Sequence, residues 1–294
     1  MKKLVPALVL AAASLPAPAA LNVVATTSSM GVLVKAVAGD SAKLTVLAPP
    51  DRDAHVLQAR PSMMVALRNA DLLVAVGAEL EIGWLPAALQ GAGNPRILPG
   101  GPGYFEAAAQ VPLLEKGRPA DRSQGDVHPA GNPHVYMDPA RMATAAAALA
   151  ERLASLDPTN AARDRERAGA FRKAVEARLA GWKAKAAGAG GILPFHKDVV
   201  YLADLLGVAI LGYVEPLPGV PPTASNLADL SARFRGKKGV LLYTEFQASK
   251  GPEFLARTLG WPAVRLPLEP PVGATAEEYL KLIDRWVDAV AAGK

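Results

Sequence analysis

Short apolar runs rich in β-branched residues alternate with helix-forming segments along the first part of the chain. Three such runs are typical of buried strands and cover residues 21–26, 44–48 and 71–77. Apolar periodicity over 30–37 predicts a helix after the first run, and Pro61 suits the first turn of another helix before the third. Strands that alternate with helices at this spacing predict βαβ units and a parallel sheet.

The middle of the chain is expected to be helical. Residues 139–154 and 160–187 are rich in alanine, arginine and glutamate, which are strong helix formers. The second helix would be roughly 40 Å long at about 1.5 Å per residue, enough to cross a whole protein. It is expected to end at the Gly-rich stretch 188–191.

The last third of the chain again alternates predicted strands with predicted helices, as the first part does. Four apolar runs read as buried strands, over residues 192–195, 208–214, 239–244 and 263–268. Helical segments are expected between and after them, near residues 198–206, 223–235, 250–259 and 275–291. The whole pattern predicts an α/β protein with two lobes, each holding a parallel sheet flanked by helices, and one long rigid helix between them.

Shifts in amino-acid composition along the chain predict the boundaries of the lobes and of the linking helix. We expect an N-terminal lobe over 21–157, a linking helix over 158–188 and a C-terminal lobe over 189–294. Within the first lobe, residues 99–133 are rich in glycine, proline and polar residues, which indicates a long flexible surface flap.

The first 20 residues have the order of features typical of a signal peptide. Lys2 and Lys3 precede an apolar run over 4–15, and Ala17-Pro-Ala19 supplies a cleavage pattern of small residues, so cleavage is expected near Ala19 or Ala20. The chain has no cysteine, so we expect no lipid anchor, and no later apolar run is long enough for stable membrane insertion. A periplasmic location is therefore expected.

Charge and cysteine content exclude several classes of function. Without Lys2 and Lys3 the chain has 30 basic and 27 acidic residues, a net charge of +3 that is spread along the sequence. This balance argues against nucleic-acid binding. The lack of cysteine removes disulfides and thiolate chemistry. Residues 100–103 are glycine-rich but lack the strand-to-helix context of a nucleotide-binding loop, so any ATPase must be a separate chain.

The four histidines are the candidate ligand-binding residues of the chain. His55 follows the strand at 44–48, and His196 ends the strand at 192–195. Ligands of open parallel sheets bind outside the carboxyl ends of the strands, where both residues fall. His134 lies between the two halves, just before a predicted helix. These three imidazoles are therefore expected to converge on the cleft between the lobes.

Three imidazoles without thiolates suit zinc, because magnesium, calcium and manganese prefer oxygen ligands. The fourth ligand should be a carboxylate or a water molecule. Glu245 and Glu269 each follow a late strand and either is a candidate. His128, with Asp121 and Asp126, lies in the predicted flap, where we expect it to be exposed to solvent and to have a minor role.

Several motifs together make the sequence similar to the zinc/manganese substrate-binding proteins of ABC importers, the cluster A-I solute-binding family. They lie in the family's order and cover residues 53–62, 131–139, 194–196, 215–222 and 243–247. The resemblance implies two lobes joined by one rigid helix, with the metal in the cleft between them. It implies His55, His134 and His196 as the first three ligands; manganese-type members usually have glutamate at the third, so His196 favours zinc.

For the fourth ligand the resemblance favours Glu269 over Glu245, although Leu266-Pro-Leu-Glu269 departs from the family's commoner Leu-Asp-Pro-Leu pattern. It further implies one Zn²⁺ per chain as the transported ligand, a monomer, and a permease and an ATPase as partners. Two other hypotheses stay open besides a manganese-binding homologue. A zinc hydrolase would also use three histidines, with Asp53 or Asp198 as the base, but no motif supports it. An adhesin or structural envelope protein would leave the histidines unexplained.

Overall fold

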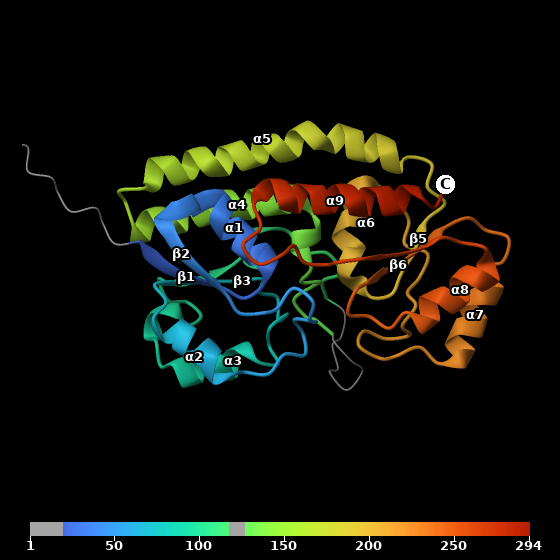
Figure 1. Cartoon of the computed structure of the whole chain (residues 1–294), viewed down its shortest axis with the longest axis horizontal. Helices are drawn as coiled ribbons and strands as arrows, with labels where there is room; N and C mark the ends of the chain where they lie inside the picture. Colours follow the sequence, from blue (N-terminus) through green and yellow to red (C-terminus); the bar gives the residue numbers. More distant parts are fainter. Residues whose placement is uncertain (1–19, 118–126) are drawn as a thin grey trace, which may run out of the picture.

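The computed structural model describes residues 20–117 and 127–294, in which two parallel sheets lie next to each other (Figure 1). The predicted signal peptide therefore lies outside the described residues, apart from Ala20. The first sheet has the strand order β2-β1-β3-β4 and all its strands run parallel. Its strands are β1 (Leu21–Ala25), β2 (Ala42–Val46), β3 (Leu72–Ala75) and β4 (Tyr104–Glu106).

The helices of this sheet begin where the sequence offers a cap. Helix α1 (Ser28–Ala38) follows Thr27, whose side chain accepts a hydrogen bond from the backbone N–H of Met30. Helix α2 (Pro61–Arg68) starts with its proline in the first turn, as predicted. Helix α3 (Leu85–Ala92) was not predicted, and it packs against α2.

Strand β4 corrects the prediction of a flap over 99–133, because the first part of that segment joins the sheet. Gly103 accepts a hydrogen bond from Leu73, and a Cβ on Gly103 would lie only 2.4 Å from the carbonyl oxygen of Asp71. A glycine that suggested a loop is thus required for a close approach of two strands. Phe105, in the middle of β4, is buried in the core.

The second sheet has the order β5-β6-β7 and is also parallel. Its strands are β5 (Ile192–Pro194), β6 (Val240–Thr244) and β7 (Ala263–Leu266). The predicted strand over 208–214 is wrong. That segment runs beside β5 and is joined to it by backbone hydrogen bonds, but the β-bridge between Ile192 and Ile210 is isolated and no ladder forms. Pro194 has no N–H to continue the ladder, and its carbonyl oxygen accepts from Val214, so regular pairing stops.

A layer of long helices joins the two sheets. Helix α4 (Pro139–Leu156) is followed by α5 (Ala161–Ala186), which runs the length of the molecule (Figure 1), as the composition predicted. Helix α9 (Ala276–Ala291) packs against α5 and α1 and so reaches from the second sheet to the first. One continuous hydrophobic core includes side chains of both sheets and of these helices. The two halves are therefore fused on this side rather than linked by a flexible connection.

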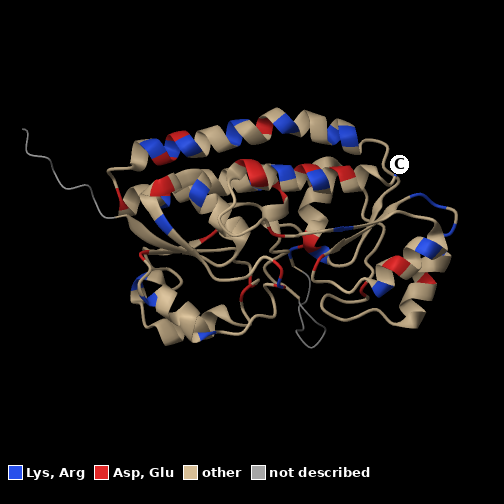
Figure 2. Cartoon of the chain, in the orientation of Figure 1, with Lys and Arg blue, Asp and Glu red and all other residues tan. Residues whose placement is uncertain are grey.

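The other faces of the sheets have separate cores. Helices α2 and α3 cover the first sheet, and α7 (Ala224–Phe234) and α8 (Lys250–Leu259) cover the second, while α6 (Val200–Leu206) contacts α5. Basic residues, with a few acidic ones among them, are spread along α5 (Figure 2). Within the described residues no helix combines the length and apolarity needed to span a bilayer.

Candidate metal centre

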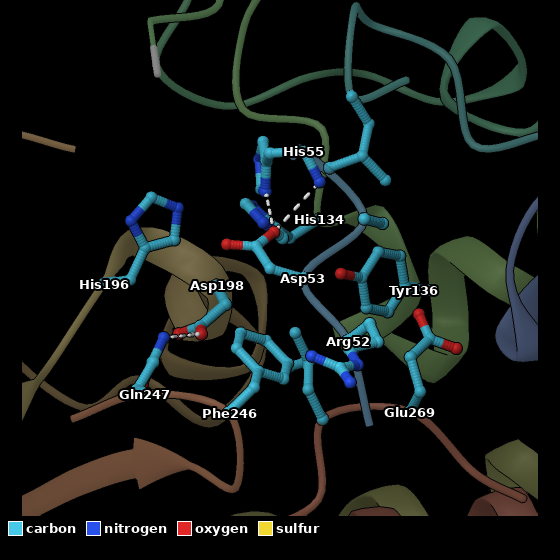
Figure 3. A pocket seen from close by; sticks show the side chains of 13 residues that line it. Arg52, Asp53, His55, His134, Tyr136, His196, Asp198, Phe246, Gln247 and Glu269 are labelled. Carbon is cyan, nitrogen blue, oxygen red and sulfur yellow. Dashed lines mark hydrogen bonds and ion pairs between the residues drawn. The ribbon is translucent and has the colours of Figure 1, made fainter. Parts of the chain in front are cut away.

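Three histidines that are distant in the sequence meet between the two sheets (Figure 3). His55 follows β2, His134 precedes α4, and His196 follows β5. One potential ligand atom from each lies within 4.8 Å of those of the other two. Their ring centroids are 5.2 to 5.5 Å apart, so the imidazoles form a nearly equilateral triangle.

His55 is held by the residue two positions before it. Oδ1 of Asp53 accepts one hydrogen bond from the backbone N–H of His55 at 2.9 Å and another from its Nδ1 at 2.7 Å. The loop itself is fixed by Trp84, whose indole N–H donates to the carbonyl of Ala54 at 2.8 Å. Although burial raises the pKa of Asp53, its hydrogen bond to His55 and the charge of that ring hold this pKa below the ordinary 3.8.

His134 is held by the same local device. Oδ1 of Asn132 accepts from the backbone N–H of His134 and from its Nδ1, both at 2.9 Å. The amide group of Asn132 also donates to the carbonyl of Lys197 at 2.9 Å, next to His196. An Asp-x-His and an Asn-x-His segment thus orient two rings, and the second segment is tied to the loop that carries the third.

His196 has a partner from farther along the chain. Its Nδ1 donates to Oε1 of Glu215, and both side chains are buried. Oε2 of Glu215 accepts from the backbone N–H of Gly219 at 3.2 Å, which fixes the carboxylate. A carboxylate behind a histidine orients the ring and raises its basicity as a metal ligand.

These contacts leave one nitrogen of each ring for a ligand. With each Nδ1 used as a donor, the lone pair of a neutral imidazole is on Nε2. Among the described residues, none of the three Nε2 atoms has a hydrogen-bond partner, although all three are buried. Buried polar atoms without partners are rare and require an explanation. Three oriented nitrogens of this kind are the donor set of a divalent-metal site.

The protonation states of two of the rings are driven in opposite directions. Burial, together with the neighbouring imidazoles, holds the pKa of His134 well below the ordinary 6.5. For His196, burial lowers the pKa, but the hydrogen bond that the ring donates to Glu215 and the charge of Asp198 outweigh it and raise the pKa to about 9. Without metal, His134 is therefore neutral at pH 7 and His196 is a cation that must lose a proton to bind a metal.

The histidines line a chamber of about 20 Å³, which is close to the volume that one water molecule needs. Asp198 and Glu269 are also in its wall, with Tyr136 (Figure 3). Burial raises the pKa of Glu269 to about 7, against hydrogen bonds from Ser29, and it raises the pKa of Asp198. Gln247 donates to Asp198 at 2.9 Å, whereas Oε1 of Glu269 has no hydrogen-bond partner in the described part of the chain.

The two predicted carboxylate candidates lie in different places. Glu269 is buried in the chamber wall, where its Oε2 accepts from the backbone N–H of Ser29 at 2.6 Å. It does not belong to the group of ligand atoms that lie within 4.8 Å of one another, which consists of the three histidines. Glu245 is exposed and does not line the chamber.

The expectation that His128 is exposed is wrong. The residue is half-buried, and its ring centroid lies 5.2 Å from that of His55. Asp121 and Asp126, the acidic residues of the predicted flap, lie outside the described residues.

Asn132 and Glu215 hold the rings of His134 and His196, and the sequence did not indicate either contact. The spacing could have indicated Asn132, because Asp53 and Asn132 each precede a histidine by two positions. No local signal indicated Glu215, which is 19 residues from His196 and reaches it only through the irregular segment beside β5.

Two parallel sheets around a common three-histidine chamber define the class of two-lobed α/β binding proteins. The chain belongs to the family described as "Zinc-uptake complex component A periplasmic", whose profile matches residues 23–293. This match includes every residue of the chamber.

Individual relatives are similar over most of their length. The "High-affinity zinc uptake system protein ZnuA" of Yersinia pestis is 27% identical over 252 residues, which are 78% of this chain and 76% of the relative. The manganese complex of FpvC from Pseudomonas aeruginosa superposes with a TM-score of 0.78 at 24% identity, covering 93% of this chain and 98% of the other. A crystal structure titled as ZnuA has a TM-score of 0.77 at 19% identity, with coverages of 93% and 99%. At these identities the two structures support the fold.

Proposed function

We propose that the chain is a periplasmic zinc-binding protein that captures Zn²⁺ and delivers it to an ABC-type metal importer. The observation that carries the proposal is the set of three buried imidazoles, each with Nδ1 anchored and Nε2 without a partner. The family description and the name of the Yersinia pestis relative both refer to zinc uptake. In this proposal the protein acts by reversible coordination and is not an enzyme.

We assign the ligands of one Zn²⁺ per chain to His55, His134, His196 and Glu269. Among the carboxylates of the chamber, Glu269 is supported by its buried Oε1, which lacks a hydrogen-bond partner in the described residues. Tetrahedral bonds of about 2.0–2.1 Å place ligand atoms roughly 3.4 Å apart. The histidine nitrogens, which lie within 4.8 Å of one another, need only a small inward movement, and Glu269 needs a larger one.

Zinc is favoured over manganese by the donor chemistry. Three neutral nitrogens and one carboxylate suit a borderline-soft ion, whereas manganese prefers an oxygen-rich set. A manganese-bound relative among the solved structures makes Mn²⁺ the relevant competitor in any binding assay. The bound site would have a net charge of about +1, if the imidazoles are neutral and the carboxylate is ionised.

The proposal includes the organisation of the chain. A signal peptide over 1–20 would direct export, with lobes over 21–157 and 189–294 and a linking helix over 158–188. The mature protein would act as a monomer, and a separate permease and ATPase would complete the importer. The core shared by both sheets supports a modest closing motion, because a large rotation would break packing along α5 and α9.

The test compares His134→Ala with the matched control His128→Ala. Each protein is loaded with zinc, dialysed and analysed for metal content. We expect about one zinc per chain in the wild type and in the control, and loss of stoichiometric zinc in His134→Ala. A His134→Ala protein that retains zinc would refute the ligand assignment. Competition with Mn²⁺ in the wild type tests the choice of metal.

A further inference from the structure

A second, much larger cavity opens beside the metal chamber. It has a volume of about 1010 Å³ and is lined from both halves of the molecule by the loops that follow β2, β5 and β6. Both cavities are lined by the residues that form the neck between them: Arg52, Asp53, His196, Phe246 and Gln247. A molecule in this outer cavity is therefore next to His196.

The outer cavity is too large for a metal ion alone. The inner chamber of about 20 Å³ already suffices for an ion with protein ligands. Small-molecule sites occupy roughly 300–1,000 Å³, and the outer cavity is at the upper end of that range. Its apolar lining, which includes Met63, Phe195 and Pro221, offers contact surface for a carbon skeleton.

The charges of the outer cavity favour an anion. Of its three carboxylates, Asp53 and Glu215 are already bonded to histidines, and the third, Asp51, is exposed. Arg52 and Arg60 are exposed, and neither guanidinium has a carboxylate within 4.0 Å among the residues that the structure describes. The two guanidinium groups outnumber the one exposed carboxylate and leave a net charge of +1, which disfavours a free Zn²⁺ ion. They bind carboxylates well, because a guanidinium can donate two parallel hydrogen bonds to one carboxylate.

Arg52 is placed to act on both cavities. It lines the inner chamber as well as the outer cavity, and Figure 3 draws it between Phe246 and Glu269. Arg60 lies at the start of α2, on the outer cavity only. The two cations thus mark the inner and outer ends of a site for a molecule with several carboxylates.

We propose that the outer cavity binds a small polycarboxylate chelator of zinc, held by Arg52 and Arg60. Zinc then arrives as an anionic complex, which the two guanidinium groups attract, and passes through the neck to the histidines by exchange of ligands. No covalent bond is made or broken other than the coordination bonds of the metal. This inference rests on the proposed zinc-binding function and identifies the form in which the metal is captured.

The experiment uses citrate as the chelator and the zinc-free full chain. Direct binding of citrate is measured by calorimetry for the wild type, for Arg52→Gln, Arg60→Gln and the double variant, and for Arg172→Gln. Arg172 is an exposed arginine of α5 and serves as the matched control. We expect the double variant to bind citrate at least about tenfold more weakly than the wild type, because both guanidinium contacts are lost, and Arg172→Gln to bind like the wild type.

A second measurement separates this inference from the proposed function. Zinc uptake is followed by stopped-flow fluorescence, either from zinc citrate or from zinc chloride in a non-coordinating buffer. Arg60→Gln, which changes a residue of the outer cavity only, should take up zinc more slowly from citrate and no more slowly from chloride. Failure of the wild type to bind citrate, or equal citrate binding by the double variant, overturns the inference. Failure of the wild type to bind zinc from chloride would instead overturn the proposed function.

Discussion

Glu215→Gln should change how zinc affinity depends on pH. In the wild type the pKa of His196 is raised to about 9, chiefly through the hydrogen bond and charge of Glu215 and the charge of Asp198 acting against burial. Zinc needs the neutral ring, so the bound proton competes with the metal below that pH. At pH 7 removal of this proton costs roughly 3 kcal/mol, which weakens zinc binding on the order of 100-fold.

Glu215→Gln has two opposing effects on zinc affinity, one through the pKa of His196 and one through the strength of its ring as a metal ligand. A glutamine can still accept from Nδ1 and orient the ring, but loss of the carboxylate lowers the pKa of His196, so the proton penalty at pH 7 largely disappears. Loss of an anionic partner behind a ligand typically weakens metal binding about 10- to 100-fold. The zinc Kd at pH 7 should therefore stay within about tenfold of the wild type, while its dependence on pH changes clearly.

The assay measures zinc affinity by competition with a chelator between pH 7 and 8. The wild-type Kd should fall about tenfold over this interval, because the pH lies below the raised pKa, and the variant should change little. Calorimetry at pH 8, where Glu269 is largely ionised, in two buffers of different ionisation enthalpy should show release of about one proton per zinc from the wild type and close to none from the variant. Glu253→Gln, on the exposed side of α8, is the control. Equal slopes for the wild type and Glu215→Gln would refute the reasoning.

The remaining predictions concern the other residues of the site and the shared core. Asn132→Ala should weaken zinc binding about 10- to 100-fold by chelator competition, because one ligand ring loses its anchor; unchanged affinity would argue against that role. Glu269→Gln should weaken zinc binding and Glu245→Gln should not, and the reverse result would exchange their assignments. Trp286→Ala should lower the free energy of unfolding of the zinc-free protein by about 3–5 kcal/mol in urea, because the side chain is fully buried, whereas the exposed Phe254→Ala should change it by less than about 1 kcal/mol.

Much of the fold could be predicted from local patterns. The long helix α5 follows from a run of strong helix formers, and the strands β1, β3 and β6 follow from short buried apolar runs. Strand β4 could not be predicted, because Gly103 is needed for strand contact but is also typical of a loop. The extended segment after α6 failed as a strand because its neighbour contains Pro194.

The sequence alone identified the three histidines, because they are few and because two of them follow strands whose carboxyl ends meet a cleft. Spacing says nothing about distances between residues that lie some 60 to 80 positions apart. Only the tertiary structure decided that one ligand atom of each ring lies within 4.8 Å of the other two, that His128 lies beside His55, and that Glu269 lies in the wall outside this group. The physical reason is that packing of α5 and α9 across both sheets sets the separation of the loops, and buried partners such as Glu215 set the direction of each ring.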